Sequence, residues 1–164
     1  MATRRTKATF ILAAFLLLAA WLGTYAWDAT GRRWSLPFAL DADPVLATPI
    51  DGMAWNATDP QIRGWMKGGQ PVTVPADIAS DLRKVLADSS TYKLVDTQCF
   101  VPHIAFSFGQ GPGRVDVVVC LFCDRVYFYR GDQSVGHSLT HEGHNRLMAI
   151  YRRIFHADPE MPSP

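Results

Sequence analysis

The hydrophobic pattern opens with a long apolar stretch. After Arg4, Arg5 and Lys7, the residues from Ala8 to Trp27 carry no charge. As a helix this stretch rises about 30 Å, roughly the thickness of the hydrocarbon core of a bilayer. The basic residues precede it, which favours a cytoplasmic N-terminus and places the rest of the chain outside. The sequence therefore predicts a transmembrane signal-anchor or a signal peptide in residues 1–27.

The fate of this segment decides the expected location. Thr24-Tyr25-Ala26 is a poor small-x-small cleavage site with aromatic neighbours, which favours an uncleaved anchor. We then expect the protein in a bacterial inner membrane, with its domain facing the periplasm or the exterior, or secreted if the segment is cleaved. The first cysteine is Cys99, so we expect attachment by the helix rather than by a lipid.

The pattern changes twice more along the chain. Residues 28–71 contain scattered Pro, Gly and Asp and keep no period of 2 or 3.6, which indicates a loosely ordered stalk or linker. Residues 72–164 contain periodic segments and are expected to form one small domain. Within it, Ile78, Leu82 and Leu86 recur at helical spacing after Pro75, and the period ends near Asp88.

A second helix and a sheet complete the expected domain. Thr140 suits the N-cap of a last helix whose apolar stripe includes Leu147, Ile150 and Ile154. Apolar residues alternate over 104–108 and again over 115–121, which predicts two strands. Residues 125–130 alternate as a third. We expect an α+β fold in which two helices cover one face of a three-stranded antiparallel β-meander.

The first two strands are expected to form a hairpin with a defined register. The intervening segment 109–114 is rich in glycine but is followed by a strand, so it indicates a turn rather than a phosphate-binding loop. Pairing Phe108 with Val115 places the bulky side chains on one face. The same register puts His103 opposite Cys120 on the second face.

This pairing gathers the cysteines Cys99, Cys120 and Cys123 at one end of the sheet. In an oxidising compartment we expect one disulfide, from Cys99 to Cys120 or Cys123, and no cofactor. A first alternative is a zinc site with Cys99, His103, Cys120 and Cys123 as ligands. A second is thiol–disulfide exchange by the Cys120-x-x-Cys123 pair.

Charge narrows the classes of function. Without the three basic residues before the apolar stretch, 13 of the 16 basic residues remain against 15 acidic ones. Beyond Arg32-Arg33 there is no basic cluster, so nucleic acid is not an expected partner. The expected partner is the membrane, through the N-terminal helix, and the sequence specifies no protein partner.

The sequence contains no complete catalytic constellation. Asp116 is expected on an exposed strand face, and Ser107 has no evident base. An enzyme is therefore disfavoured, and a disulfide-stabilised binding or interaction module is the favoured class. The metal-binding and thiol-redox alternatives depend on the same cysteines.

Several short motifs resemble a group of uncharacterised bacterial exported proteins, many of them lipoproteins. The resemblance covers roughly residues 75–155 and consists of a Cys-aromatic-x-Pro element leading into a hairpin that ends in Cys-aromatic-x-Cys. It implies a preceding helix, a C-terminal helix and clustered cysteines, and it implies no reaction. The matching segments are Ser90-Thr91-Tyr92, Cys99-Phe100-Val101-Pro102, Phe106-Ser107-Phe108 and Val119-Cys120-Leu121-Phe122-Cys123.

Overall fold

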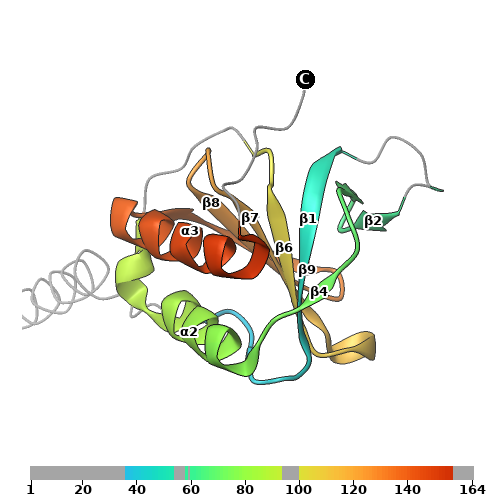
Figure 1. The fold of residues 1–164 in the computed structure, drawn as a ribbon, viewed down its shortest axis with the longest axis horizontal. Helices are drawn as coiled ribbons and strands as arrows, with labels where there is room; N and C mark the ends of the chain where they lie inside the picture. The colour runs from blue at the N-terminus through green and yellow to red at the C-terminus, as the bar shows by residue number, and fades with distance from the viewer. Residues whose placement is uncertain (1–35, 54–57, 59, 94–99, 157–164) are drawn as a thin grey trace, which may run out of the picture. The chain divides into compact units, whose positions relative to one another are not determined.

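The computed structural model describes residues 36–53, 58, 60–93 and 100–156 (Figure 1). Within these residues the fold is a mostly antiparallel β-sheet with two α-helices. The helices are α2 (Ala76–Ala87) and α3 (His141–Phe155), and two short 3₁₀ turns are η1 (Ser89–Thr91) and η2 (Gly111–Gly113). The strands are β1 (Val45–Met53), β2 (Gln61–Ile62), β3 (Trp65–Lys67), β4 (Val72–Thr73), β5 (Tyr92–Lys93), β6 (Ile104–Phe108), β7 (Val115–Cys120), β8 (Arg125–Arg130) and β9 (Gln133–Leu139).

The expected α+β fold with a sheet of only three strands is wrong, because the described residues form a mostly antiparallel sheet of nine strands. Their order is β2-β3-β1-β6-β7-β8-β9-β5, and β4 also pairs with β1. The predicted meander β6-β7-β8 forms its centre. The sheet extends on one side through β9 and β5 and on the other side through β1. β9 was not predicted, because its residues are mostly polar and show no apolar alternation.

Residues expected to form a stalk belong to this sheet. β1 pairs antiparallel with β6 from Val45 opposite Phe108 to Pro49 opposite Ile104, and β2 and β3 follow it. The interpretation of 28–71 as a loose linker is therefore wrong over β1, β2 and β3. This interpretation was wrong because Pro49 and Gly52 lie inside β1 and break its apolar alternation. β2 and β3, with two and three residues, are too short to display a period.

The helices and the hairpin register agree with expectation. α2 ends at Ala87 with Asp88 as its C-cap, and the Thr140 side chain caps α3 by accepting a hydrogen bond from the Gly143 backbone N–H at 3.0 Å. Phe108 faces Val115, and Ile104 faces Val119. Figure 1 shows α2 and α3 together on one side of the sheet.

Over β6 and β7 the opposite face of the sheet is also covered. Ile50 of β1 and Ile62 of β2 pack on Ala105 and Val118, which are paired across β6 and β7. Every residue of β6 and β7 is consequently buried. This second layer overturns the expectation that Asp116 is exposed, since its side chain has no solvent-accessible surface.

The membrane segment expected in residues 1–27 lies outside the described residues. Among the helices that the structure describes, none is both long and apolar enough to cross a membrane.

Candidate functional site

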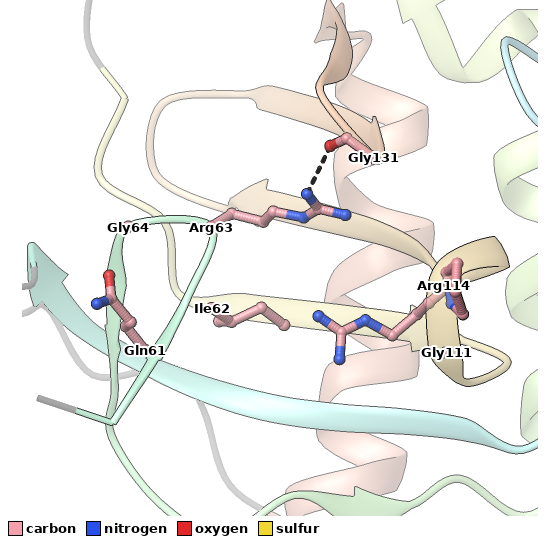
Figure 2. A pocket seen from close by; sticks show the side chains of 8 residues that line it. Gln61, Ile62, Arg63, Gly64, Gly111, Arg114 and Gly131 are labelled. Carbon is pink, nitrogen blue, oxygen red and sulfur yellow. Dashed lines mark hydrogen bonds between the residues drawn. The ribbon is translucent and has the colours of Figure 1, made fainter. Parts of the chain in front are cut away.

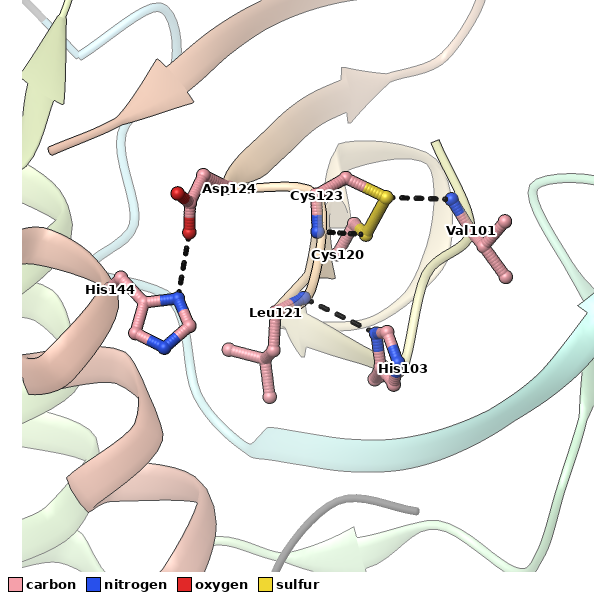
Figure 3. The surroundings of a disulfide bond; sticks show 7 residues. All are labelled: Val101, His103, Cys120, Leu121, Cys123, Asp124 and His144. Carbon is pink, nitrogen blue, oxygen red and sulfur yellow. Dashed lines mark hydrogen bonds and ion pairs between the residues drawn. A yellow bond between two sulfur atoms is a disulfide. The ribbon is translucent and has the colours of Figure 1, made fainter. Parts of the chain in front are cut away.

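The first candidate site, called here the cysteine corner, consists of Cys120, Cys123 and the adjacent His103 and lies at the turn between β7 and β8 (Figure 3). A disulfide joins Cys120, the last residue of β7, to Cys123, with their Cα atoms 5.3 Å apart. The expected bond from Cys99 to one of these residues is therefore not the one that forms. Cys99 itself lies outside the described residues. The disulfide closes a local turn and does not link distant segments.

His103 packs beside this turn, as the hairpin register predicts. Its Nδ1 accepts a hydrogen bond from the Leu121 backbone N–H at 3.2 Å, and its ring meets the Phe122 ring edge-on at 4.7 Å. The side chain is 5% exposed, and Nε2 has no hydrogen-bond partner among the described residues. Burial lowers the pKa of His103 below its usual value, which favours the neutral ring.

Both sulfur atoms accept backbone hydrogen bonds. The Cys123 N–H donates to the Cys120 Sγ at 2.9 Å, and the Val101 N–H donates to the Cys123 Sγ at 3.4 Å. Such donors stabilise a thiolate when the bond is reduced. Cys120 is fully buried, whereas Cys123 is partly exposed. A reducing thiol would therefore have to attack at Cys123.

The four-residue zinc set is not assembled in this state. A thiolate ligand needs a free sulfur, and Cys120 and Cys123 are bonded to each other. Over the part of the chain that the structure describes, no three His, Cys, Asp or Glu side chains are grouped for a metal ion. Cys99, the fourth predicted ligand, falls outside that part.

Next to the disulfide, Asp124 links the turn to α3. Its carboxylate lies 2.7 Å from Nδ1 of His144, and its backbone has a positive φ of 51°. The Asp124 carbonyl also accepts a hydrogen bond from the Leu139 N–H at 2.7 Å. The turn that carries the disulfide is thus held from the segment before β6, from β9 and from α3.

A second site lies at the other end of the hairpin, around the buried carboxylate of Asp116. Ser107 Oγ donates to its Oδ1 at 2.7 Å, since the two residues are paired across β6 and β7. Arg63 Nε lies 2.6 Å from Oδ2. Arg114 Nε lies 3.0 Å from Oδ1, and its Nη2 donates to Oδ2 at 3.1 Å.

A cleft of about 410 Å³ opens beside these arginines (Figure 2). It forms where three turns meet: Arg63-Gly64 between β2 and β3, the segment around η2 between β6 and β7, and Gly131 between β8 and β9. The lining residues are Gln61, Ile62, Arg63, Gly64, Gly111, Pro112, Arg114 and Gly131.

Sequence reasoning did not find this second site. The predicted hairpin register pairs Ser107 of β6 with Asp116 of β7, and each is a polar residue in an otherwise apolar strand. Arg114 precedes Asp116 by two residues. Those three residues were the available signal. Arg63 gave none, because it lies 53 residues from Asp116 and in a segment expected to be loose.

The fold and the two sites define a mostly antiparallel β-sheet domain with a disulfide-closed turn at one end and an arginine-lined cleft at the other. Comparison with protein-family models, with curated proteins and with solved structures found no significant match.

Proposed function

We propose that the protein is a membrane-anchored or secreted protein of the bacterial cell envelope, and that its sheet domain is a disulfide-stabilised binding module. The observation that carries the proposal is the Cys120–Cys123 disulfide, because such bonds persist in oxidising compartments outside the cytoplasm. The uncharged stretch of residues 8–27 supplies the export signal. The resemblance to exported bacterial proteins supports the same location.

A stabilising role for the disulfide fits its surroundings. Cys120 is fully buried, and the nearby His103 uses its Nδ1 to accept the backbone N–H of Leu121. The imidazole thereby fixes the β7–β8 turn. A histidine held in this way supports the turn rather than serving as a proton donor for a reacting sulfur.

Thiol–disulfide exchange is a second candidate, favoured by the backbone N–H groups that donate to both sulfurs. An incoming thiolate would attack Cys123 Sγ, form a mixed disulfide and release the Cys120 thiolate. A second external thiol would then reduce the mixed disulfide, so that two thiols are oxidised as the protein disulfide is reduced.

The full chain, produced in a bacterium with its N-terminal segment, tests both candidates. After trapping of free thiols by alkylation, membrane and periplasmic fractions are analysed by intact mass, peptide mapping and metal analysis. The binding module predicts an exported chain in which Cys120 and Cys123 are linked in nearly all molecules. A matched Cys99→Ser variant should keep that link.

Other outcomes separate the alternatives. A pair found partly reduced in the periplasm, which equilibrates with added glutathione, would favour exchange. Three alkylatable cysteines with one equivalent of zinc would contradict the disulfide and restore the ligand set Cys99, His103, Cys120 and Cys123. A chain that remains in the cytoplasm would contradict the proposed location.

A further inference from the structure

The cleft between the three turns carries an excess of positive charge. Two guanidinium groups, of Arg63 and Arg114, surround the single carboxylate of Asp116. The carboxylate has no exposed surface, whereas the side chains of Arg63 and Arg114 are 22% and 44% exposed. The surface that a ligand would meet is therefore cationic, and the negative charge lies beneath it.

One arginine already satisfies the buried carboxylate. Arg114 binds both oxygens of Asp116 through Nε and Nη2, a two-pronged geometry that suits a guanidinium and a carboxylate. Ser107 donates a further hydrogen bond to Oδ1. Neutralising Asp116 thus does not require Arg63, and the second cation needs another explanation.

Arg63 is nevertheless held firmly at the cleft. Its backbone has a φ of 54° and Gly64 a φ of 81°, which are the signs that a two-residue type I′ hairpin turn requires. Few residues other than glycine and asparagine adopt this conformation readily. The side chain donates from Nη1 to the Gly131 carbonyl at 2.8 Å, and the guanidinium lies 5.5 Å from the centre of the Tyr129 ring.

Each guanidinium keeps a nitrogen for a ligand. Within the described residues, Nη2 of Arg63 and Nη1 of Arg114 make no hydrogen bond. Figure 2 shows the two side chains extending toward one another from separate turns. A group with two or more anionic oxygens between them would receive charge-assisted hydrogen bonds from both.

We propose that this cleft binds the oxyanion end, a carboxylate or a phosphate, of a small organic molecule. The volume of about 410 Å³ exceeds that of a single ion and lies in the range of small-molecule sites. Gln61, Ile62 and Pro112 line the space that the rest of the molecule occupies. The proposal rests on the binding role proposed above and names its ligand class, with residues that the cysteine corner does not include.

Titration of the full chain in an uncharged detergent, followed by amide NMR, tests the proposal. The probes are inorganic phosphate and acetate, each at constant ionic strength against chloride. We expect saturable shifts of the Gly64, Gly111 and Gly131 amides with one of the probes. Saturation with phosphate alone assigns a phosphate group, and saturation with acetate alone assigns a carboxylate.

Variants establish that the arginines bind the probe. Arg114→Gln should weaken binding at least tenfold, because it removes a charge-assisted contact. Arg114→Lys keeps the positive charge near Asp116 but lacks the fork, and it should also weaken binding while the fold is retained. Lys84→Gln, which removes an exposed cation from α2, is the matched control and should titrate like the unmodified chain.

The inference is overturned if neither probe saturates, if shifts spread over exposed basic residues, or if both Arg114 variants bind as the unmodified chain does. Such a result on an exported chain whose disulfide is intact overturns the anion site alone. Failure of the export and disulfide experiment, by contrast, contradicts the proposed function while leaving this titration interpretable.

Discussion

At the scale of single residues, two buried polar side chains lie near opposite ends of the β6–β7 hairpin: Asp116 near its turn and His103 near its open end. Asp116 lies in a site without solvent, where three neighbouring side chains donate hydrogen bonds to its carboxylate oxygens. His103 has only one of its ring nitrogens satisfied among the described residues. Its neutral form therefore suits the site better than the protonated form.

This difference predicts an acid-sensitive contribution to stability. The folded pKa of His103 is depressed below about 6.5, so its contribution is complete above the unfolded pKa and is lost as the pH falls through that value toward the folded pKa. His137, whose pKa burial also lowers, contributes in the same direction. Between pH 7.5 and 5, the free energy of unfolding of His103→Asn should fall less steeply than that of the unmodified chain.

The measurement is urea unfolding at several pH values, and the slope due to one histidine is at most about 1.4 kcal/mol per pH unit. The asparagine side chain introduced by this substitution would keep a hydrogen-bond acceptor for Leu121 without titrating in this range. The control Phe122→Leu alters the contact with the ring but removes no titrating group. Identical slopes for His103→Asn and the unmodified chain would contradict the statement that burial lowers the pKa of His103 in the folded protein.

At the scale of elements, η1 makes a close backbone contact that connects α2 to α3. Thr91 in η1 donates from Oγ1 to the Val85 carbonyl at 2.6 Å, and its own carbonyl accepts the Thr140 N–H at 2.9 Å. The first turn of α3 therefore lies directly against the backbone of η1. Gly143 makes that approach possible, since a Cβ there would lie 2.9 Å from the Thr91 Cα.

Gly143→Ala should consequently destabilise the fold. In an unconstrained helix this substitution stabilises by about 1 kcal/mol. Here the added methyl meets backbone that cannot rotate away, and we expect a loss of about 2 kcal/mol in the free energy of unfolding. The comparison is Gly113→Ala in η2, where a Cβ meets nothing within 4 Å and the change should stay within about 0.5 kcal/mol. A stabilised Gly143→Ala variant would show that η1 and α3 do not pack in this way.

At the scale of the whole molecule, the centre of the sheet, β6 and β7, is covered on both faces. The helices lie on one side of the sheet. On the other face, Ile50 of β1 and Ile62 of β2 pack on Ala105 and Val118. The disulfide stabilises this architecture less than a bond between distant segments would, because Cys120 and Cys123 are three residues apart. In the chain-entropy account the contribution of a disulfide grows with the length of the loop it closes.

The double variant Cys120→Ala/Cys123→Ala should therefore remain folded, with a loss of about 2 kcal/mol on the chain-entropy scale. The change is measured by urea unfolding under oxidising conditions. Cys99→Ser, which leaves the Cys120–Cys123 bond intact, provides the comparison. Complete unfolding of the double variant, or an equal loss in Cys99→Ser, would contradict the local role of this disulfide.

The sequence by itself determined the elements whose signal is local. α2, α3 and the β6–β7 register follow from apolar periods, from the Thr140 cap and from a short turn, and the structure confirms them. The placement of His103 next to Cys120 follows from that register. These features depend on residues close in the chain, where side-chain period and turn chemistry decide the outcome.

Only the tertiary structure decided the rest. β1 pairs with β6 across more than fifty residues, and β2 and β3 are too short to show a period, so the second layer has no local signature. That layer buries Asp116 and brings Arg63 to it. The choice of Cys123 as the partner of Cys120 was likewise set by the geometry of the β7–β8 turn. For the second layer the deciding contacts join groups that lie far apart in the sequence, so neither residue spacing nor apolar period reveals them.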